Sequence, residues 1–187
     1  MSRRFQFHST PLAGLVVLEH LPQVDGRGYF ERLFCARELQ ALGLETPILQ
    51  INRSRTAKAG TIRGMHFQHP PHNEAKIISC LQGEVFDVAV DLRRGSPTFL
   101  RWYGQILSAD NHKSFYLPEG FAHGFQSLTD ECDMLYFHTQ SFCPEAAGGL
   151  SPFLPELGIS WPLPVTEVSE KDRSRPLSLG QFQGIDL

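Results

Sequence analysis

Short runs of aliphatic, aromatic and β-branched residues, broken by glycine, proline and aspartate, dominate the hydrophobic pattern of this chain. Runs of this length and spacing are typical of the strands of an all-β sandwich or barrel. Gly83 separates two of the runs and predicts a tight hairpin between them. The predicted strands are residues 14–20, 47–54, 61–68, 75–81, 84–92, 99–107, 113–118 and 133–139.

Helical periodicity is limited to one clear segment, residues 35–43. Leu39 and Leu42 share a face there, and Gly43 can end the helix. From about residue 150 the sequence is rich in proline and glycine, as in "LSPFLPELGISWPLP". This composition predicts an irregular wrap over the sheet and not a second domain, so we expect a single domain over residues 1–187.

The composition is that of an ordinary globular protein. Hydrophobic residues make up 41 %, with 14 phenylalanines, which is enough for a proper core. The net charge of −3 predicts no bulk attraction to nucleic acid or to an anionic membrane. No apolar run reaches the length of a membrane span, and the first residues lack the apolar core of a signal peptide. The four cysteines lack CxxC spacing, which favours reduced thiols in a cytoplasmic protein.

Strand alternation sorts the candidate polar residues onto faces. In 84–92 Asp87 lies opposite an apolar face that we expect to pack against a second sheet, so Asp87 would face solvent or a polar cavity. In 133–139 Tyr136 and His138 share one face. In 61–68 strict alternation separates Arg63 from His66.

Arg63 and His66 can serve one site only if the strand is irregular between them. Gly64 is the natural place for such a bulge, because glycine inside a strand often marks one.

The stretch "TIRGMHFQHPPHNEAKI", residues 61–77, contains three histidines, which leaves a metal cage, acid–base chemistry and a solvated loop as alternatives. Pro118, Gly120 and His123 form the P-x-G-x-x-H signature of cupin barrels, many of which bind metal. A metal-binding cupin also needs two histidines one residue apart and a downstream glutamate. Here His66, His69 and the following histidine are three apart, so neighbours point to opposite faces of a strand. We therefore predict no metal site.

Several long motifs, in order from about residue 12 to 176, resemble the dTDP-4-dehydrorhamnose 3,5-epimerase family of sugar-nucleotide epimerases. The resemblance implies an all-β cupin-type jelly-roll barrel with a few short helices, and an enzyme that needs no metal and no cofactor. The motifs are "DGRGYF" (25–30), "QINRS" (50–54), "IRGMHFQ" (62–68), "GEVFDVAVDLRRGSPTF" (83–99), "LPEGFAHGF" (117–125), "LYFHT" (135–139) and "GISWP" to "SEKD" (158–172).

The resemblance also implies roles for individual residues. His66 matches the catalytic base, Asp172 the carboxylate that orients it, Tyr136 the acid and Lys76 the lysine near the developing enolate. Asp172 has a second interpretation, because "SEKD" is a capping box in which Ser169 would cap a helix. The implied substrate-binding residues are Arg27, Gln50, Asn52, Arg63, Asp87, His123 and Lys171, with Arg27 acting across a dimer interface.

The implied reaction is epimerisation of a nucleotide-linked 4-keto-6-deoxy sugar at C3, C5 or both, of the type that converts dTDP-4-dehydro-6-deoxyglucose to dTDP-4-dehydrorhamnose. Alternatives are a C3-only epimerase or ketoisomerase of the same fold, and a metal-dependent or non-catalytic sugar-binding cupin. The family implies a homodimer that exchanges N-terminal strands.

The chain departs from the family pattern at four single positions, where Arg32, Phe137, Phe142 and Ala147 replace a glutamate, a lysine, an aromatic hydroxyl and a glutamate, and in the stretch before "GISWP", where "SPFLP" replaces a Trp-Asn-Asp sequence. These changes touch nucleotide and sugar contacts and leave the proton-transfer residues intact.

Overall fold

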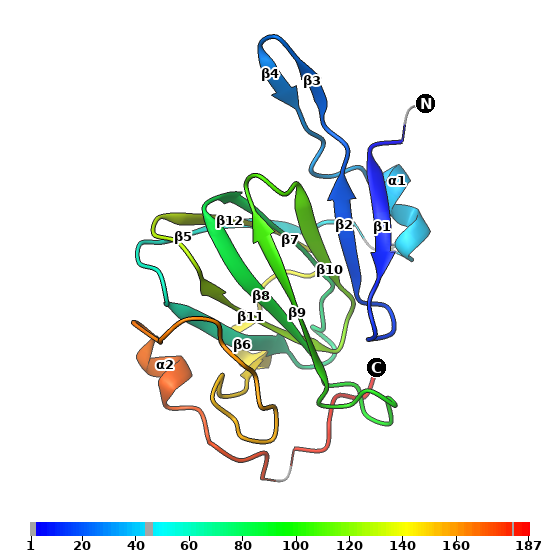
Figure 1. Cartoon of the computed structure of the whole chain (residues 1–187). Helices are drawn as coiled ribbons and strands as arrows, with labels where there is room; N and C mark the ends of the chain where they lie inside the picture. Colours follow the sequence, from blue (N-terminus) through cyan, green and yellow to red (C-terminus); the bar gives the residue numbers. More distant parts are fainter. Residues whose placement is uncertain (1–2, 44–46, 181) are drawn as a thin grey trace.

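Two antiparallel sheets face each other in the computed structural model, which describes residues 3–43, 47–180 and 182–187 (Figure 1). The arrangement confirms the all-β jelly-roll barrel. The larger sheet has the order β1 (Phe5–Ser9), β2 (Val16–His20), β10 (Lys113–Leu117), β7 (Lys76–Gln82), β12 (Cys132–His138), β5 (Gln50–Thr56). The smaller sheet has the order β13 (Ala147–Gly149), β6 (Ile62–Gln68), β11 (Phe121–Ser127), β8 (Glu84–Asp91), β9 (Trp102–Ser108).

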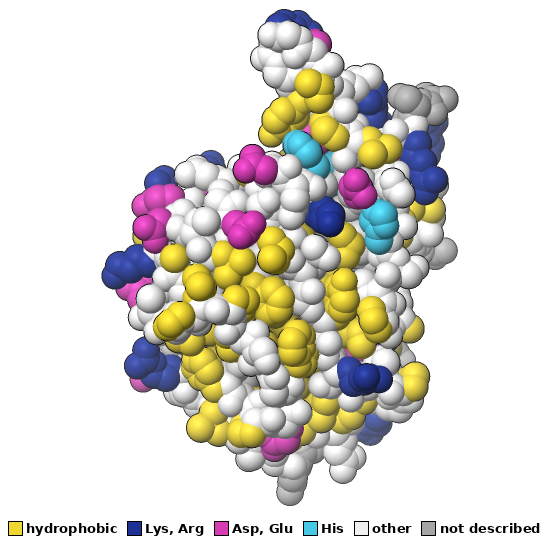
Figure 2. Space-filling view, viewed as in Figure 1, with side chains coloured by type: hydrophobic (Ala, Val, Ile, Leu, Met, Phe, Trp, Pro, Cys, Tyr) yellow, Lys and Arg dark blue, Asp and Glu magenta, His cyan; other side chains and the backbone are white. Residues whose placement is uncertain are grey.

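A two-stranded hairpin, β3 (Gln23–Asp25) and β4 (Gly28–Phe30), projects from the body of the molecule (Figure 1). Val24, Tyr29 and Phe30 are exposed on it, and Figure 2 shows hydrophobic side chains gathered at its base. Exposed side chains of this size on a projecting arm are typical of a contact surface.

The predicted helix 35–43 is present, although its second half is tighter than an α-helix. α1 (Ala36–Leu39) continues directly into the 3-10 helix η1 (Gln40–Leu42). Gly43 ends it in the left-handed conformation, at φ 75°. Leu39 is fully buried in a cluster with Leu18 and Ile77, so α1 covers the outer face of the larger sheet.

The main core fills the space between the two sheets. Val85 and Ala89 of β8 meet Phe115 of β10 and Met134 of β12 there. The opposite face of β8, with Val88 and Val90, packs under the C-terminal tail. The prediction that this apolar face meets the second sheet is therefore wrong: it is the alternate face of β8, the one that carries Asp87, that looks into the barrel.

Gly83 does not form a hairpin. β7 pairs with β10 and β12 in the larger sheet, whereas β8 pairs with β11 and β9 in the smaller one. The chain therefore crosses between sheets at Gly83, with φ 75°. A Cβ there would lie 2.5 Å from Thr129 Oγ1, which leaves room for glycine alone.

The tail beyond residue 150 is the irregular wrap that composition predicted. Gln126 of β11 holds it by donating to the Leu163 carbonyl and accepting from the Leu163 N–H. A further hydrogen bond attaches the tail to β6, where the Ile62 N–H donates to the Glu167 carbonyl. These bonds place the last helix, α2 (Glu170–Arg173), beside β6 (Figure 1). The remaining 3-10 turn is η2 (Pro144–Ala146).

Within the described ranges, no helix is long and apolar enough to cross a membrane.

Candidate active site

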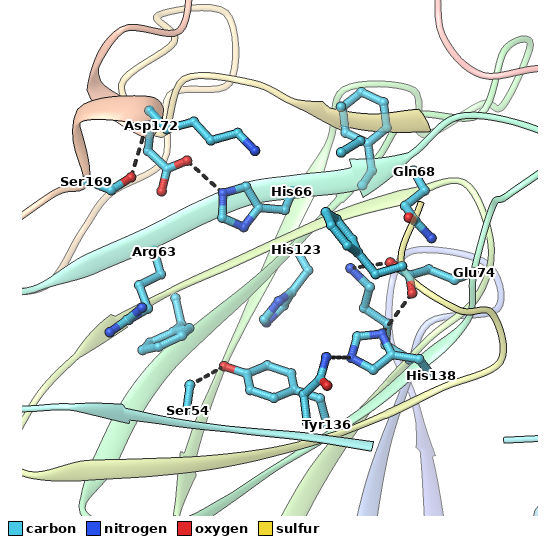
Figure 3. Close-up of a pocket in the computed structure, with 18 residues that line it drawn as sticks. Ser54, Arg63, His66, Gln68, Glu74, His123, Tyr136, His138, Ser169 and Asp172 are labelled. Carbon is cyan, nitrogen blue, oxygen red and sulfur yellow. Dashed lines mark hydrogen bonds and ion pairs between the residues drawn. The ribbon is translucent and has the colours of Figure 1, made fainter. Parts of the chain in front are cut away.

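A cavity of about 450 Å³ opens between the two sheets and collects most of the predicted site residues (Figure 3). Strands β5 and β12 form one wall and β6 and β11 the other, with α2 at the rim. The predicted residues that line it are Asn52, Arg63, His66, Lys76, His123, Tyr136, Lys171 and Asp172.

His66 and Asp172 form a hydrogen-bonded pair at one wall. His66 Nε2 lies 2.6 Å from Asp172 Oδ1. The His66 side chain is 46 % exposed and faces the cavity, whereas the Asp172 side chain is 4 % exposed behind it. With Nε2 donating to the carboxylate, the lone pair of a neutral His66 is on Nδ1. A histidine fixed in this way can take a proton from a group in the cavity.

Asp172 takes part both in the helix cap formed by Ser169 and in the hydrogen-bonded pair with His66. Ser169 Oγ accepts the Asp172 N–H at 3.1 Å and so begins α2. The single helical turn then aims the Asp172 carboxylate at β6, where it also meets the Gly64 N–H at 3.4 Å. The two interpretations of "SEKD" are thus one structure, because the cap sets the direction of the carboxylate.

The Asp172 carboxylate is charged at neutral pH. Burial alone would raise its pKa, but hydrogen bonds from His66, Ser169 and Gly64 and the charge of His66 outweigh burial, so the pKa lies below its usual value. A lasting negative charge here favours the proton on Nε2 and stabilises the imidazolium that forms when Nδ1 accepts a proton.

Gly64 allows Arg63 and His66 to reach the same cavity. His123 of β11 pairs with His66, but Phe125 pairs with Arg63, so Gly64 and Met65 together oppose one residue. This confirms the predicted bulge. A Cβ on Gly64 would lie 2.5 Å from the Cα of Gly124, so the two strands approach more closely than any side chain permits.

Tyr136 faces the pair from the other wall (Figure 3). It lies on β12, shares a face with His138 as alternation predicted, and its hydroxyl lies 3.1 Å from Ser54 Oγ. Burial raises the pKa of Tyr136 well above its usual value. The phenol therefore keeps its proton at neutral pH and is available as an acid.

His123 and Asp87 form a second buried imidazole–carboxylate pair between these walls. His123 Nε2 lies 2.9 Å from Asp87 Oδ2, and the His123 ring packs edge-on against Tyr136 at 6.1 Å. Asp87 is fully buried behind the histidine, and burial raises its pKa despite the bond from His123. Asp87 therefore does not face solvent, and it meets the cavity only through His123, which lines it.

Besides Asp87, two predicted residues do not line the cavity. Gln50 lies one step back, where its Nε2 donates to Asn52 Oδ1 at 3.1 Å. Arg27 is at the tip of the β3–β4 hairpin, paired with Asp25, and its side chain is 92 % exposed. Arg27 therefore lies away from the cavity of its own chain.

The departures from the family pattern fall in different places. Phe137 points away from the cavity and packs against Phe34 outside the larger sheet. Phe142 and Ala147 line the cavity itself. Arg32 lies outside it and bonds to Glu38. Two of the four changes thus alter the cavity wall.

Sequence reasoning missed some lining residues, chiefly Ser54, Gln68 and Glu74, and it assigned no role to His138. The shared face of His138 and Tyr136 was a usable signal for His138. Glu74 precedes a strand in a loop, where alternation gives no direction. In the part of the chain that the structure describes, no three His, Cys, Asp or Glu side chains are grouped as a metal site requires.

Comparison with known proteins identifies the family. The dTDP-4-dehydrorhamnose 3,5-epimerase family model matches residues 9–178. The dTDP-4-dehydrorhamnose 3,5-epimerase of Methanothermobacter thermautotrophicus is 42 % identical over 92 % of this chain and 95 % of its own length.

Solved structures give the same result. A dTDP-6-deoxy-D-glucose-3,5-epimerase from Legionella pneumophila, in complex with dTDP-4-keto-L-rhamnose, is 40 % identical over 91 % of both chains, with a TM-score of 0.87. A 3'-monoepimerase from Streptomyces bikiniensis, in complex with dTDP-quinovose, is 32 % identical over 90 % of this chain and 86 % of its own, with a TM-score of 0.84. The chain therefore belongs to the dTDP-4-dehydrorhamnose 3,5-epimerase family of isomerases.

Proposed function

We propose that this enzyme epimerises a nucleoside-diphosphate-linked 4-keto-6-deoxy sugar at C3, C5 or both, in the manner of the conversion of dTDP-4-dehydro-6-deoxyglucose to dTDP-4-dehydrorhamnose. The observation that carries the proposal is the placement of His66 and Tyr136 on opposite walls of one cavity (Figure 3). Inversion of a carbon centre needs a base on one side of the sugar ring and an acid on the other.

The C4 ketone of such a sugar acidifies the hydrogens on C3 and C5. His66 Nδ1 removes one of them, and the electron pair of the C–H bond moves through the adjacent carbon to O4, giving an enolate. Tyr136 then donates its phenolic proton to the same carbon from the opposite face. The sugar leaves with one inverted centre, and both residues regain their starting protonation by exchange with water.

The enolate oxygen needs a cationic or hydrogen-bonding partner. Lys76 supplies an ammonium group in the cavity, and His123 supplies an imidazole between the two walls. Neither step draws on a metal or on an organic cofactor.

The diphosphate would be compensated by cations at the rim. Arg63 has its guanidinium fixed by Thr56 Oγ1 at 3.1 Å and by the Arg55 carbonyl, so it is held in place for a phosphate oxygen. Lys171 on α2 is a second cation of the rim. Arg27 would be a third, contributed by the hairpin of a partner subunit in a homodimer.

A C3-only epimerase is the second candidate. Its support is that Phe142 and Ala147 alter the cavity wall and that a 3'-monoepimerase from Streptomyces bikiniensis shares the fold at 32 % identity. The two candidates share the base and the acid and differ in which carbons reach them.

Deuterium wash-in, followed by NMR on dTDP-4-dehydro-6-deoxyglucose in D₂O, tests the proposal. Exchange at C3 and C5 supports the double epimerase, and exchange at C3 alone supports the monoepimerase. No exchange at either carbon would contradict both.

His66→Ala should abolish exchange, a loss of at least about a thousandfold, because it removes the base. Binding of dTDP should stay within severalfold. His69→Ala is the matched control, because His69 follows the same strand but lies outside the cavity lining, and it should exchange at the wild-type rate. Equal loss of exchange and of dTDP binding in His66→Ala would mean that His66 is structural.

A further inference from the structure

Glu74 and His138 line the cavity and take no part in the reaction proposed above. His138 ends β12 and pairs in register with Lys76, the first residue of β7. His138 Nδ1 lies 2.8 Å from Glu74 Oε2, and Lys76 Nζ lies 3.0 Å from Glu74 Oε1. The Glu74, Lys76 and His138 side chains are 9 %, 9 % and 12 % exposed. The three form a nearly buried cluster centred on one carboxylate.

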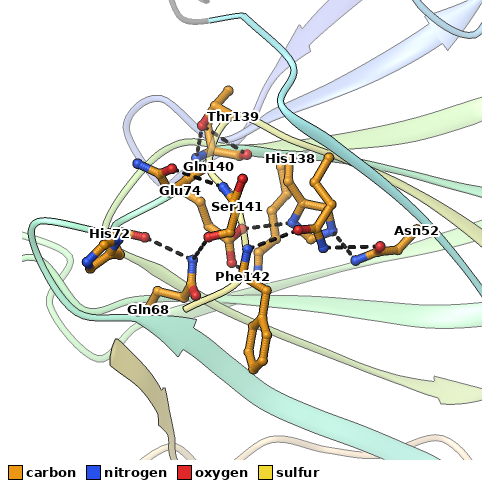
Figure 4. Close-up of polar contacts among 12 residues, drawn as sticks. Asn52, Gln68, His72, Glu74, His138, Thr139, Gln140, Ser141 and Phe142 are labelled. Carbon is orange, nitrogen blue, oxygen red and sulfur yellow. Dashed lines mark hydrogen bonds and ion pairs between the residues drawn. The ribbon is translucent and has the colours of Figure 1, made fainter. Parts of the chain in front are cut away.

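The cluster continues as a chain of hydrogen bonds along the cavity edge (Figure 4). His138 Nε2 lies 3.2 Å from Asn52 Nδ2, Asn52 Oδ1 accepts from Gln50 Nε2 at 3.1 Å, and Gln50 Oε1 accepts the Phe142 N–H at 3.0 Å. The two ends fix the direction of every bond, because a backbone N–H only donates and an ionised carboxylate only accepts.

It follows that each member donates toward Glu74. Asn52 Nδ2 donates to His138 Nε2, which must be the unprotonated nitrogen, and His138 Nδ1–H donates to Glu74. Burial alone would raise the pKa of Glu74, but the bonds from His138 and the charge of Lys76 hold it below its usual value. The carboxylate end of the chain is therefore an acceptor at neutral pH.

This direction decides what Asn52 and Gln50 offer to a ligand. Each carbonyl oxygen already accepts one hydrogen bond within the chain, while each NH₂ group donates one hydrogen within the chain and has a second hydrogen left to donate. Asn52 is exposed on the edge of the cavity. The edge thus presents hydrogen-bond donors, which suit a hydroxyl, keto or phosphate oxygen.

The same chain holds the segment that carries Phe142. Gln50 Oε1 of β5 accepts the Phe142 N–H, and Gln68 Oε1 of β6 accepts the Cys143 N–H at 2.7 Å. Gln68 also donates to the Ser141 carbonyl at 3.3 Å (Figure 4). Because β5 and β6 belong to different sheets, the segment bridges the two walls at the position where Phe142 lines the cavity.

We propose that Glu74 and His138 are positioning residues that, together with Gln50, orient the amide of Asn52 so that its free N–H donates a hydrogen bond to an oxygen-bearing group of the substrate. The inference rests on the proposed function and adds to it a determinant of substrate binding.

His138→Gln and His138→Asn form a matched pair of test variants. A glutamine amide reaches the place of Nε2 and can accept from Asn52, whereas an asparagine amide reaches the place of Nδ1 and leaves Asn52 without its acceptor. We expect His138→Asn to raise KM for dTDP-4-dehydro-6-deoxyglucose about five- to tenfold, the worth of one hydrogen bond. His138→Gln should stay within about twofold of wild type, and kcat should be little changed in both. Equal effects of the two variants, or a fall in kcat at constant KM, would overturn the proposal.

¹⁵N NMR of the histidine side chains gives a readout that is independent of turnover. We expect His138 as the Nδ1–H tautomer at neutral pH in the wild type, and a loss of that preference in Glu74→Gln. An Nε2–H tautomer in the wild type would contradict the proposed direction of the hydrogen bonds, even if the enzyme epimerises its sugar. The expected tautomer in a protein that causes no exchange would instead contradict the proposed function alone.

Discussion

Tyr136 is the residue whose environment most constrains the chemistry. Its ring is enclosed between two imidazoles, with His123 edge-on and His138 stacked, both at 6.1 Å. The phenol hydroxyl hydrogen-bonds to Ser54, and burial raises its pKa more than this bond and the nearby charge of Arg63 lower it. A neutral phenol in this setting gives up its proton only to a strongly basic carbon such as an enolate.

Titration of the tyrosines checks this directly. Because burial raises the pKa of Tyr136 far above its usual value of about 10, wild type and Tyr136→Phe should show the same tyrosinate absorbance at pH 10. The folded protein holds this proton more tightly than the unfolded chain does. The stability of the wild type should therefore fall, relative to Tyr136→Phe, as the pH rises above about 10. An extra tyrosinate in the wild type below pH 10 would contradict the assignment.

Residue positions within one strand could be predicted, and contacts between distant segments could not. Alternation alone put Tyr136 and His138 on one face, because successive side chains of a strand point to opposite sides. The His66–Asp172 bond joins residues 106 positions apart, and only the family resemblance suggested it. Glu74 was missed because it lies in a loop, where the backbone follows no fixed period.

Among the elements, β6 does most to place the site. Its bulge opposite Gly124 turns both Arg63 and His66 toward the cavity, and strict pairing would hide one of them. The bulge depends on Gly64, whose φ of 140° and contact with the Gly124 backbone both exclude a side chain.

Gly64→Ala should lower the free energy of unfolding by at least about 3 kcal/mol and reduce wash-in by displacing His66. Gly28→Ala is the matched control, because Gly28 has a φ of 131° with open space around its Cβ. It should cost only the backbone strain, about 1–2 kcal/mol. Urea unfolding measures both, and a Gly64→Ala cost no larger than that of Gly28→Ala would mean that the close approach of the strands is unimportant.

Most longer strands could be predicted from apolar runs, but their partners could not. The Gly83 break was predicted as a hairpin because a glycine between two runs is the usual sign of one, whereas the chain changes sheets there. Short strands such as β13, with the sequence Ala-Gly-Gly, have no strand propensity of their own and exist because β6 offers a free edge. Pairing is a property of the assembled barrel and not of a local run.

At the scale of the whole molecule, the projecting hairpin β3–β4 has no role in the cavity of its own subunit. It carries Arg27 at its tip, away from its own cavity, and exposed apolar side chains along its length. We expect it to reach the cavity of a second subunit in a homodimer.

Mixing two inactive variants tests this arrangement. In a heterodimer of Arg27→Ala and His66→Ala, one cavity contains both defects and the other contains neither. After subunit exchange at equal amounts, half the dimers are mixed, so exchange should recover to about a quarter of the wild-type rate at substrate levels well below KM. Recovery no greater than the sum of the separate variants, in a sample that sedimentation shows to be dimeric, would place Arg27 in its own subunit's site or in none.

Because Asp172 lies on the irregular C-terminal tail, the orientation of the catalytic base depends on the attachment of that tail. Both sheets are complete by Gly149, yet the carboxylate that orients the base arrives on a segment attached to the barrel through Gln126 and the backbone of Ile62. A protease cut between residues 150 and 169, or a local detachment of that stretch, would separate the Asp172 carboxylate from His66 without removing any residue of the two sheets. Catalytic competence thus depends on the least regular part of the chain. A barrel that is folded but whose tail is detached would lack the carboxylate that orients the base.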